Sequence, residues 1–463
     1  MDTADLLERL SEQPGARELL AVAPAGAYLV GGAVRDLLLG RSPRELDVVL
    51  KGSRERDVAL EGGVALEGGE GDARPVVSDG PARLAAELVA SLRRRSDMRG
   101  WEHLVGESVH ERFGTASVTW EGARIDIAAA RRERYAAPGA LPTVEPASLQ
   151  EDLLRRDFTI NTLAFALDGT DPRELLGAPR ALEDLRAGVL RVLHERSFSD
   201  DPTRLWRLAR YRARLGFAIE PHTAELAAEA VAAGSLSTVS GARIGAELRL
   251  ALVERFPEEA FAALDELGLL AALHPRLRYE QTLVERAQAL LRSPPTDTAE
   301  ELAFGALVDD DRQDLLLLAT LTLPLALRAD GNPRGEVAAL LDRLEFPAGD
   351  RDRVADAVAA TPALIDALGS AERPSQLRAA TLHVSPEAVA LAGALSESAT
   401  SAARLWLGDL RHVRLRVRGE DLLRAGLPQG PEIGRRLEEL LRRRLDGELS
   451  DDRDAQLRVA IAD

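Results

Sequence analysis

The spacing of apolar residues changes once along this chain, near residue 180. Before that point, short runs with strand-like character, such as 28–32, 45–50 and 124–130, are interleaved with helical segments. After it, apolar residues recur at the i, i+3 and i+4 positions typical of amphipathic helices. Because the two periods place side chains on different surfaces, the chain must form one sheet-containing region followed by helices. The sequence therefore predicts an α+β fold with its β-sheet near the N-terminus.

The length of the chain requires several hydrophobic cores. Its 463 residues correspond to about three or four domains of ordinary size. We predict boundaries near residues 165, 255 and 360, which give the ranges 1–165, 166–255, 256–360 and 361–463. Within the first range, residues 52–81 contain the glycine-rich doubled unit VALEGGVALEGG, and we expect them to form a mobile insert between strands.

The composition limits the chemistry that the chain can perform. It contains no Cys, and its seven His residues lack the spacing of zinc sites, so any metal would be held by carboxylates. The net charge of −17 opposes nucleic-acid binding on average. Arginines nevertheless gather at 93–95, 204–214, 411–418 and 435–444, although each run taken alone is more typical of a solvated helix face.

No export or membrane signal is predicted. The first ten residues are acidic and amphipathic, unlike a signal peptide. The longest apolar run, from Leu315 to Leu327, is interrupted by Pro324 and is too short to cross a bilayer. We therefore expect a cytoplasmic protein with no membrane partner, and the sequence leaves its oligomeric state open.

Two acids two residues apart occur in the strand-like run ELDVVL. On a strand, Glu45 and Asp47 project from the same face, while the residues between and after them pack inward. Two carboxylates on one face suit Mg²⁺, which keeps several waters and completes its octahedron with phosphate oxygens. The spacing alone is more typical of an edge strand with solvated acids.

A glycine pair precedes these acids and strengthens the functional interpretation. Gly31 and Gly32 end one strand and lead directly into a helix, where backbone N–H groups can approach a phosphate closely. A third acid, Asp126, lies inside the apolar run RIDIAAA, where an unpaired carboxylate would be costly. Three acids around two metals imply phosphoryl or nucleotidyl transfer.

Three segments in this order resemble class II tRNA nucleotidyltransferases and bacterial poly(A) polymerases. They are GGAVRDLLLGR with the following acid pair, then RRDFTIN at 155–161, then DDPTRLWRLARYRARLGF at 200–217. A C-terminal segment at 417–441 resembles the tail of some members more loosely. The resemblance implies a nucleotidyltransferase head with a small mixed β-sheet, followed by an all-α neck, body and tail that read the nucleotide and bind tRNA.

The resemblance also implies roles for individual residues. In the family the matching carboxylates bind two Mg²⁺, which assigns catalysis and metal binding to Glu45, Asp47 and Asp126. The substrates would be CTP and ATP, and the partner tRNA. The residues matching those that contact the incoming nucleotide are Gly31, Gly32, Arg35, Arg155, Arg156, Asp157 and Asn161.

The family reads the base with the motif Glu-Asp-x-x-Arg, which Asp200, Asp201 and Arg204 match here. Cytosine and adenine both present an amino donor beside a ring-nitrogen acceptor, so a carboxylate and an arginine can select them together. Asp201 before Pro202 is equally suited to cap a helix, in which case the two roles compete for its oxygens.

One face of the helix that follows is rich in arginine. Arg207, Arg210 and Arg214 share this face, and we expect them to contact triphosphate or RNA backbone. Such contacts would offset the unfavourable charge of the whole chain.

The expected reaction is template-independent addition of CCA, or part of it, to tRNA 3′ ends. A poly(A) polymerase shares every motif above, although the acidic end at 451–463 differs from the basic tails of the family's polymerases. Enzymes that add only CC or only A stay open, because the loop 136–143 does not decide between them.

A third hypothesis is a catalytically impaired RNA-binding relative. Glu45 stands where the family usually has Asp, and Asp200 where it usually has Glu. The longer arm of Glu45 keeps the charge but can displace a metal that demands octahedral geometry. The insert at 52–81 is a further departure from the family.

Overall fold

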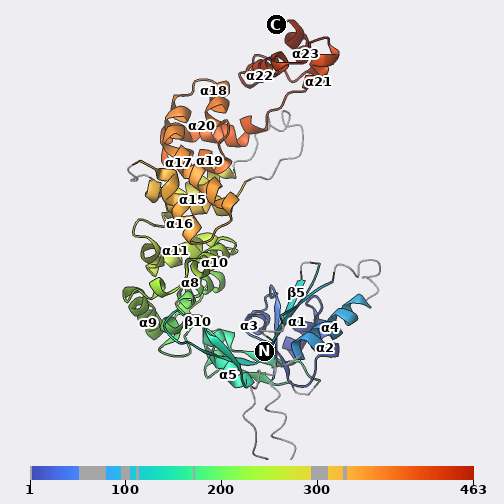
Figure 1. The fold of residues 1–463 in the computed structure, drawn as a ribbon, viewed down its shortest axis with the longest axis vertical. Coiled ribbons are helices and arrows are strands. Elements are labelled where there is room, and N and C mark those ends of the chain that lie inside the picture. The colour runs from blue at the N-terminus through green and yellow to red at the C-terminus, as the bar shows by residue number, and fades with distance from the viewer. Residues whose placement is uncertain are drawn as a thin grey trace, which may run out of the picture. The chain divides into compact units, whose positions relative to one another are not determined.

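A computed structural model gives the structure of the protein (Figure 1). It describes residues 3–51, 80–94, 105–110, 114–121, 123–169, 173–292, 311–326 and 331–462. They belong to two compact units, Met1–Val239 and Ser240–Asp463, and each is described by itself. The insert predicted at 52–81 lies almost entirely outside the described residues, and the finer division into head, neck, body and tail stays a prediction.

The first unit contains a seven-stranded sheet in the order β3-β4-β5-β2-β1-β8-β9. Among these described strands only β2 and β5 pair in parallel, so the sheet is mixed and the predicted α+β class is confirmed. Its strands are β1 (Ala27–Val30), β2 (Leu46–Leu50), β3 (Gly106–His110), β4 (Thr115–Trp120), β5 (Ala123–Ala129), β8 (Ala164–Ala166) and β9 (Leu175–Leu176).

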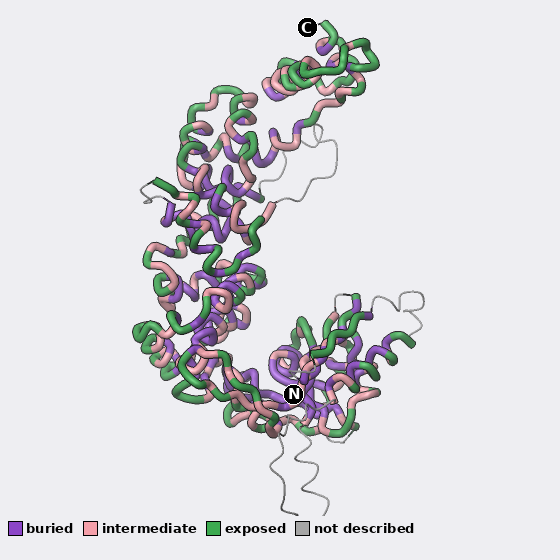
Figure 2. The backbone as a smooth tube through the Cα atoms, viewed as in Figure 1, coloured by how far each residue is buried: buried purple, intermediate pink, exposed green. Residues whose placement is uncertain are grey.

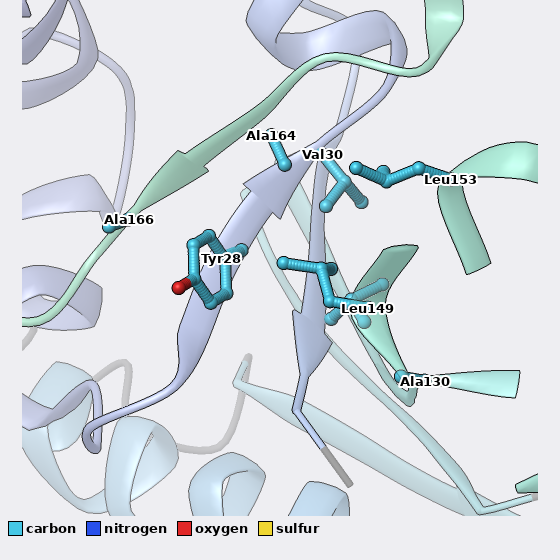
Figure 3. Close-up of a cluster of buried hydrophobic side chains, with 8 residues drawn as sticks. Tyr28, Val30, Ala130, Leu149, Leu153, Ala164 and Ala166 are labelled. Carbon is cyan, nitrogen blue, oxygen red and sulfur yellow. The ribbon is translucent and has the colours of Figure 1, made fainter. Parts of the chain in front are cut away.

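The core of this unit forms around β1, whose four residues AYLV are all buried. Figure 3 shows Tyr28 and Val30 of β1 beside Leu149 and Leu153 of helix α5 (Leu149–Leu154). The phenol of Tyr28 donates a hydrogen bond to Glu174 at 3.1 Å, which satisfies its polar group at the edge of the cluster. An apolar strand between two neighbours thus fixes the sheet on which the acids lie.

Two turns in this unit use a left-handed backbone. Glu121 adopts a φ of 43° in the tight turn between the antiparallel strands β4 and β5. Gly40 has a φ of +73° just after helix α3 (Gly32–Leu38), the conformation in which glycine commonly ends a helix.

The remaining elements of the first unit are mostly helical, and they add two small strand pairs to the predicted pattern. β6 (Arg131–Arg134) and β7 (Thr143–Pro146) form an antiparallel hairpin, whereas β10 (Val189–Leu190) and β11 (Ala218–Ile219) pair in parallel. Strands this short carry little periodicity, so the sequence did not reveal them. The helices are α1 (Thr3–Ser11), α2 (Ala16–Val22), α4 (Gly80–Arg93), α6 (Ala181–Ala187), α7 (Ser197–Asp200), α8 (Thr203–Leu215) and α9 (Pro221–Ala232), with 3₁₀ turns at Thr159–Asn161 and Ser235–Thr238.

The described part of the second unit contains helices and no strands, in agreement with the helical periodicity. Figure 2 shows buried residues throughout its middle helices and mostly exposed or intermediate residues in its last three. The helices are α10 (Gly241–Leu252), α11 (Pro257–Glu266), α12 (Leu269–Leu273), α13 (Gln281–Leu291), α15 (Gln313–Ala326), α16 (Pro333–Arg343), α17 (Ala348–Ser370), α18 (Pro374–Thr381), α19 (Pro386–Leu395), α20 (Glu397–Gly408), α21 (Gly419–Arg424), α22 (Pro431–Leu445) and α23 (Arg453–Ala462), with a 3₁₀ turn at Leu410–His412.

Helix α10 packs directly on backbone at the end of α16. A Cβ atom added to Gly241 would lie 1.9 Å from the carbonyl oxygen of Arg343, and one added to Gly245 would lie 1.8 Å from that of Leu344. Only glycine permits this approach, so these two positions fix how closely the helices pack.

The apolar run around Pro324 differs from the prediction in one respect. Pro324 lies inside α15, which continues to Ala326 instead of ending at the proline. Because Pro324 is in the last turn, it removes one hydrogen bond from the helix without breaking its core. Within the described ranges, no helix is long and apolar enough to cross a membrane.

Candidate active site

The three predicted acids lie at neighbouring positions of β2 and β5. Asp47 and Asp126 are direct partners in the parallel register of these strands, and Glu45 immediately precedes β2. Asp47 and Asp126 are partly buried, whereas Glu45 is exposed. The structure therefore brings these residues together, and we call Glu45, Asp47 and Asp126 the acid row.

The acid row concentrates negative charge at Asp47. Burial and the neighbouring carboxylates of Glu45 and Asp126 raise the pKa of Asp47 to about 6, while Arg156 acts in the opposite direction. A carboxyl whose neighbours resist its ionisation gains from a bound cation, which replaces the missing positive charge. The chemistry of these donors therefore fits a divalent metal.

Asp126 is occupied by protein groups in this structure. Its Oδ1 accepts a hydrogen bond from the hydroxyl of Ser117, which lies directly opposite on β4. The guanidinium of Arg124 lies 2.8 Å from its Oδ2. Among the described residues, no group of three or more His, Cys, Asp or Glu side chains stands ready to enclose a metal. A metal at the acid row would therefore share Asp126 with these partners or displace Arg124.

The glycine pair forms a tight passage from β1 into α3. Gly31 has a φ of 70° and a ψ of −129°, and its N–H donates to the carbonyl of Leu163 at 2.8 Å. The positive φ of Gly31 disfavours any larger residue, and a Cβ atom there would lie 2.5 Å from Nη1 of Arg156. Arg156 is therefore close to the glycine pair, and its charge also acts on the pKa of Asp47.

Arg155 and Arg156 share one buried acid that the sequence analysis did not single out. Asp152 is fully buried and lies 2.8 Å from Nη2 of Arg155 and 3.1 Å from Nη2 of Arg156. Burial alone would raise the pKa of Asp152, but the two arginines lower it. Arg155 also contacts Glu133 at 2.7 Å, so Arg155 acts as a support and Arg156 faces the glycine passage.

Asp157 and Asn161 form a second buried network. Oδ1 of Asp157 accepts from the amide of Asn161 at 2.9 Å, and Oδ2 accepts from Nε of Arg207 at 2.7 Å. Although burial alone would raise the pKa of Asp157, Arg207 and Asn161 lower it to about 2. Asp157 therefore orients its neighbours as a buried anion.

Arg35 belongs to the same network. Its side chain is 1% exposed, and Nη1 donates to the amide oxygen of Asn161 at 2.6 Å. Its Nε donates to Asp36 at 2.8 Å. In this structure Arg35 thus positions Asn161 and is enclosed by protein.

The residues that match the base-reading motif are also engaged by protein groups. Oδ1 of Asp201 accepts from the N–H of Thr203, the first residue of α8, at 3.1 Å and from its hydroxyl at 2.6 Å. The N-cap position is Pro202, so Asp201 contacts the start of the helix, as the alternative interpretation predicted, from one residue before the cap. Arg204 is buried and donates to the hydroxyl of Ser197 at 2.9 Å and to the carbonyl of Arg155 at 2.6 Å. Arg204 therefore joins the base-reading segment to the RRD segment.

Asp200 contacts a different part of the unit. Its carboxylate pairs with Arg196 at 2.8 Å, and its carbonyl accepts from the N–H of Gly139 at 3.3 Å. Gly139 lies in the β6–β7 loop that the sequence analysis considered for specificity. The loop and the base-reading segment are therefore neighbours.

The ring of Tyr211, a residue that was not predicted, lies close to two arginines of α8 and one of α3. The guanidinium carbons of Arg35, Arg207 and Arg210 lie 5.2, 5.8 and 6.0 Å from its ring centroid. This is the distance range of cation–π contacts. Its position four residues after Arg207 places it on the predicted stripe, and that spacing was the available signal.

Two families match parts of this chain. Residues 27–60 and 90–191 match the family described as poly A polymerase head domain. Residues 216–280 match the family described as probable RNA and SrmB-binding site of polymerase A. The first match includes the acid row, the glycine passage and the RRD segment.

Curated proteins of similar sequence include tRNA nucleotidyltransferases. The A-adding enzyme of Geobacter sulfurreducens is 32% identical over 447 residues, which cover 94% of this chain and 44% of that protein. The CC-adding enzyme of Deinococcus radiodurans is 34% identical over 357 residues, which cover 73% of this chain and 82% of that protein. The chain spans about half the length of the A-adding relatives it matches.

Solved structures of similar fold include CCA-adding enzymes. The Thermotoga maritima enzyme complexed with tRNA matches with a TM-score of 0.66 and 26% identity, over 100% of this chain and 98% of that chain. A CCA-adding enzyme in complex with CTP matches with a TM-score of 0.66 and 27% identity, again over 100% and 98%.

Proposed function

The chain belongs to the family of tRNA nucleotidyltransferases and poly(A) polymerases, and from this premise we propose that it adds CCA, or part of it, to tRNA 3′ ends using CTP and ATP. The observation that carries the proposal is the register of Asp47 and Asp126, together with Arg156, which lies against the glycine passage and acts electrostatically on Asp47. This arrangement combines groups for metal and for triphosphate in one place. The names of the relatives and structural neighbours support the choice of substrates.

The acid row would hold the divalent metals that nucleotidyltransferases generally use, in this proposal two Mg²⁺. Bound there, they would supply an activated 3′-hydroxyl and stabilise the pyrophosphate leaving group. Asp47 and Asp126 project from adjacent strands and could therefore bind the same metal ion. Glu45 reaches from the residue before β2, where its exposed position leaves the longer side chain room to adjust.

The incoming triphosphate would lie along Gly31, Gly32 and Arg156. Backbone N–H groups approach phosphate closely where no side chain intervenes, and Arg156 adds a positive charge at the same place. Arg155, Asp157, Asn161 and Arg35 hold this surface from behind through the buried networks described above.

Base selection would involve Asp200, Asp201 and Arg204. Reading a base requires Arg204 and Asp201 to exchange contacts with Ser197 and Thr203 for contacts with the nucleotide. Ser197 and Thr203 are buried and would lose these partners, so the contacts made with the base must offset that cost. Arg207 and Arg210 would add positive charge near the triphosphate.

We also propose that the protein acts in the cytoplasm, where tRNA and both nucleotides occur.

A narrower candidate is the addition of the terminal A alone. Three curated relatives, 31% to 34% identical, are named A-adding tRNA nucleotidyltransferases. An A-adding enzyme would use tRNA that already ends in CC and would accept ATP alone. This candidate shares the acid row and differs only in base selection.

One assay tests these proposals. Purified protein with Mg²⁺ is incubated with tRNA lacking CCA, tRNA ending in C, tRNA ending in CC and an unrelated RNA, each with CTP, ATP or both. Completion of CCA on all three tRNAs, with no extension of the unrelated RNA, supports the main proposal. Extension of only the tRNA that ends in CC supports the narrower one. Long A tracts on any RNA identify a poly(A) polymerase, and tRNA binding without extension identifies an impaired relative.

A matched variant checks the acid row in the same assay. Asp47→Ala removes the central carboxylate and is expected to lower extension by at least about a thousandfold, because both metals lose a ligand. Arg83→Ala, which removes an exposed arginine paired with Glu87, should extend tRNA normally. Normal activity of Asp47→Ala would refute the proposed site.

A further inference from the structure

Arg124 lies beside the acid row, and nothing in the proposed reaction uses it. It precedes Asp126 by two residues on β5, so both side chains project from the same face of the sheet. Its Nε lies 2.9 Å from Oδ1 and 2.8 Å from Oδ2 of Asp126. The arginine is 54% exposed and Asp126 is 27% exposed, so the pair lies where a dissolved cation can reach it.

Both oxygens of Asp126 are engaged in this arrangement. Ser117 donates to Oδ1 from the opposite position of β4, and Arg124 contacts both oxygens from β5. The ion pair with Arg124 already supplies positive charge to Asp126, so a cation that binds there must compete with the guanidinium for the carboxylate.

Arg124 also acts on the other two acids. Glu45 and Asp47 both raise the pKa of its guanidinium, after the larger effect of its hydrogen bond to Asp126. In return, Arg124 opposes the rise in the pKa of Asp47 that burial and Glu45 cause. One exposed arginine thus neutralises part of the charge of three carboxylates.

We propose that Arg124 is the internal counter-ion of the acid row and competes with divalent cations for Asp126. The proposal rests on the proposed function, because the competing cations are those of nucleotidyl transfer. Arg124 is a positioning residue in this scheme, since it acts on the metal only through the carboxylates of the acid row. Its removal is therefore expected to ease metal binding, whereas removal of a supporting residue would weaken it.

The test is a titration of the metal-free full chain with Mn²⁺, without nucleotide or tRNA, in which electron paramagnetic resonance measures the unbound ion. Arg124→Ala is expected to bind Mn²⁺ about fivefold more tightly, the upper range for loss of one exposed ion pair. Arg124→Lys keeps a positive charge and should stay within about twofold of the unmodified protein. Arg83→Ala is the matched control, because it removes an exposed arginine from the same unit without touching the acid row.

Unchanged or weaker Mn²⁺ binding by Arg124→Ala would overturn the proposal. Equal tightening by Arg124→Lys and Arg124→Ala would also overturn it, because charge competition predicts a difference between them. The tRNA extension assay is separate from this titration. If the unmodified protein extends no tRNA, the proposed function fails, and the Mn²⁺ affinities still decide the role of Arg124.

Discussion

Two helices of this protein carry nearly the same five residues in different surroundings. At the end of α5 the sequence is DLLRR, in which Asp152 pairs with Arg155 and Arg156. Within α22 it is ELLRR, in which Glu439 pairs with the corresponding two arginines at 2.8 and 2.7 Å. Asp152 is 0% exposed, whereas Glu439 is 41% exposed.

The comparison teaches that burial decides what the shared pattern does. Asp152 also accepts from the N–H of Arg131 at 3.3 Å, so it connects the end of α5 to the β6 strand. Glu439 forms its ion pairs with two arginines of its own helix, and water screens its charge. The two ion pairs of Asp152 therefore support the candidate active site, whereas the two ion pairs of Glu439 stabilise α22 locally.

The largest expected effect comes from removing the shared acid at each place. Asp152→Ala removes the acid that pairs with Arg156 and leaves Arg155 with Glu133 as its acidic partner, so it is expected to lower the free energy of unfolding by about 3–4 kcal/mol. Glu439→Ala should lower it by about 0.5 kcal/mol or less, because the pair is exposed. Urea denaturation of both variants measures the difference, and equal losses would contradict the role given to burial.

The second effect tests the close packing of α10 against the end of α16 in the second unit. Gly245→Ala would place a Cβ atom 1.8 Å from the carbonyl oxygen of Leu344, so the backbone must move and about 2–3 kcal/mol should be lost. Gly434→Ala in α22 is the control, since nothing lies within 4 Å of its Cβ, and it should gain about 0.5–1 kcal/mol. Thermal denaturation distinguishes them, and a stable Gly245→Ala protein would refute the close packing.

The third effect concerns pH. The pKa values of Asp157 and Glu439 are both lowered to about 2. For Asp157, Arg207 and Asn161 lower the pKa although burial opposes them. For Glu439, the largest cause is its hydrogen bond with Arg442. An ionised group with a lowered pKa stabilises the fold above about pH 4, and this contribution is lost as the pH falls towards 2. Asp157→Asn should therefore cost about 2 kcal/mol at pH 7 and almost nothing near pH 2.

The matching variant in α22 sharpens this third test. Glu439→Gln should change stability little at either pH, because solvent screens its ion pairs. Urea denaturation at pH 7 and at the acid limit of folding measures both variants. A loss at pH 7 that is as large for Glu439→Gln as for Asp157→Asn would show that exposure does not matter here.

The smallest effect has the opposite sign. Because the folded-state pKa of Asp47 is raised to about 6, its contribution to stability is present below about pH 4 and is lost as the pH rises through 6. Asp47→Asn should therefore stabilise the metal-free protein by about 1–2 kcal/mol more at pH 7.5 than at pH 4.5. Thermal denaturation with a chelator measures this, and destabilisation at pH 7.5 would contradict the crowding of charge at the acid row.

Much of the fold followed from the sequence because periodicity reports local structure. The alternation in ELDVVL and RIDIAAA placed Asp47 and Asp126 on strands, and the structure pairs them directly. The helical spacing after residue 180 was equally informative. The two-residue strands β10 and β11 could not be predicted, because two residues carry no period.

The site was predicted less completely, because its supports come from distant parts of the chain. Arg35 meets Asn161 across 126 residues, and only the fold shows that it is buried. The competing interpretation of Asp201 as a helix cap could be derived locally, and the structure shows that contact. The role of Arg124 was not predicted, because Asp126 was interpreted as a metal ligand and only the structure shows the arginine that neutralises its charge.

The parallel pairing of β2 with β5 has a consequence for how this protein can change during evolution. A hairpin fixes its register through the turn, but a parallel pair is joined by a crossover whose length does not set the register. The facing positions of Asp47 and Asp126 depend only on the two strands. Length changes between the end of β2 at Leu50 and the start of α4 at Gly80 therefore need not move the acids, which makes this stretch a permissive place for new sequence.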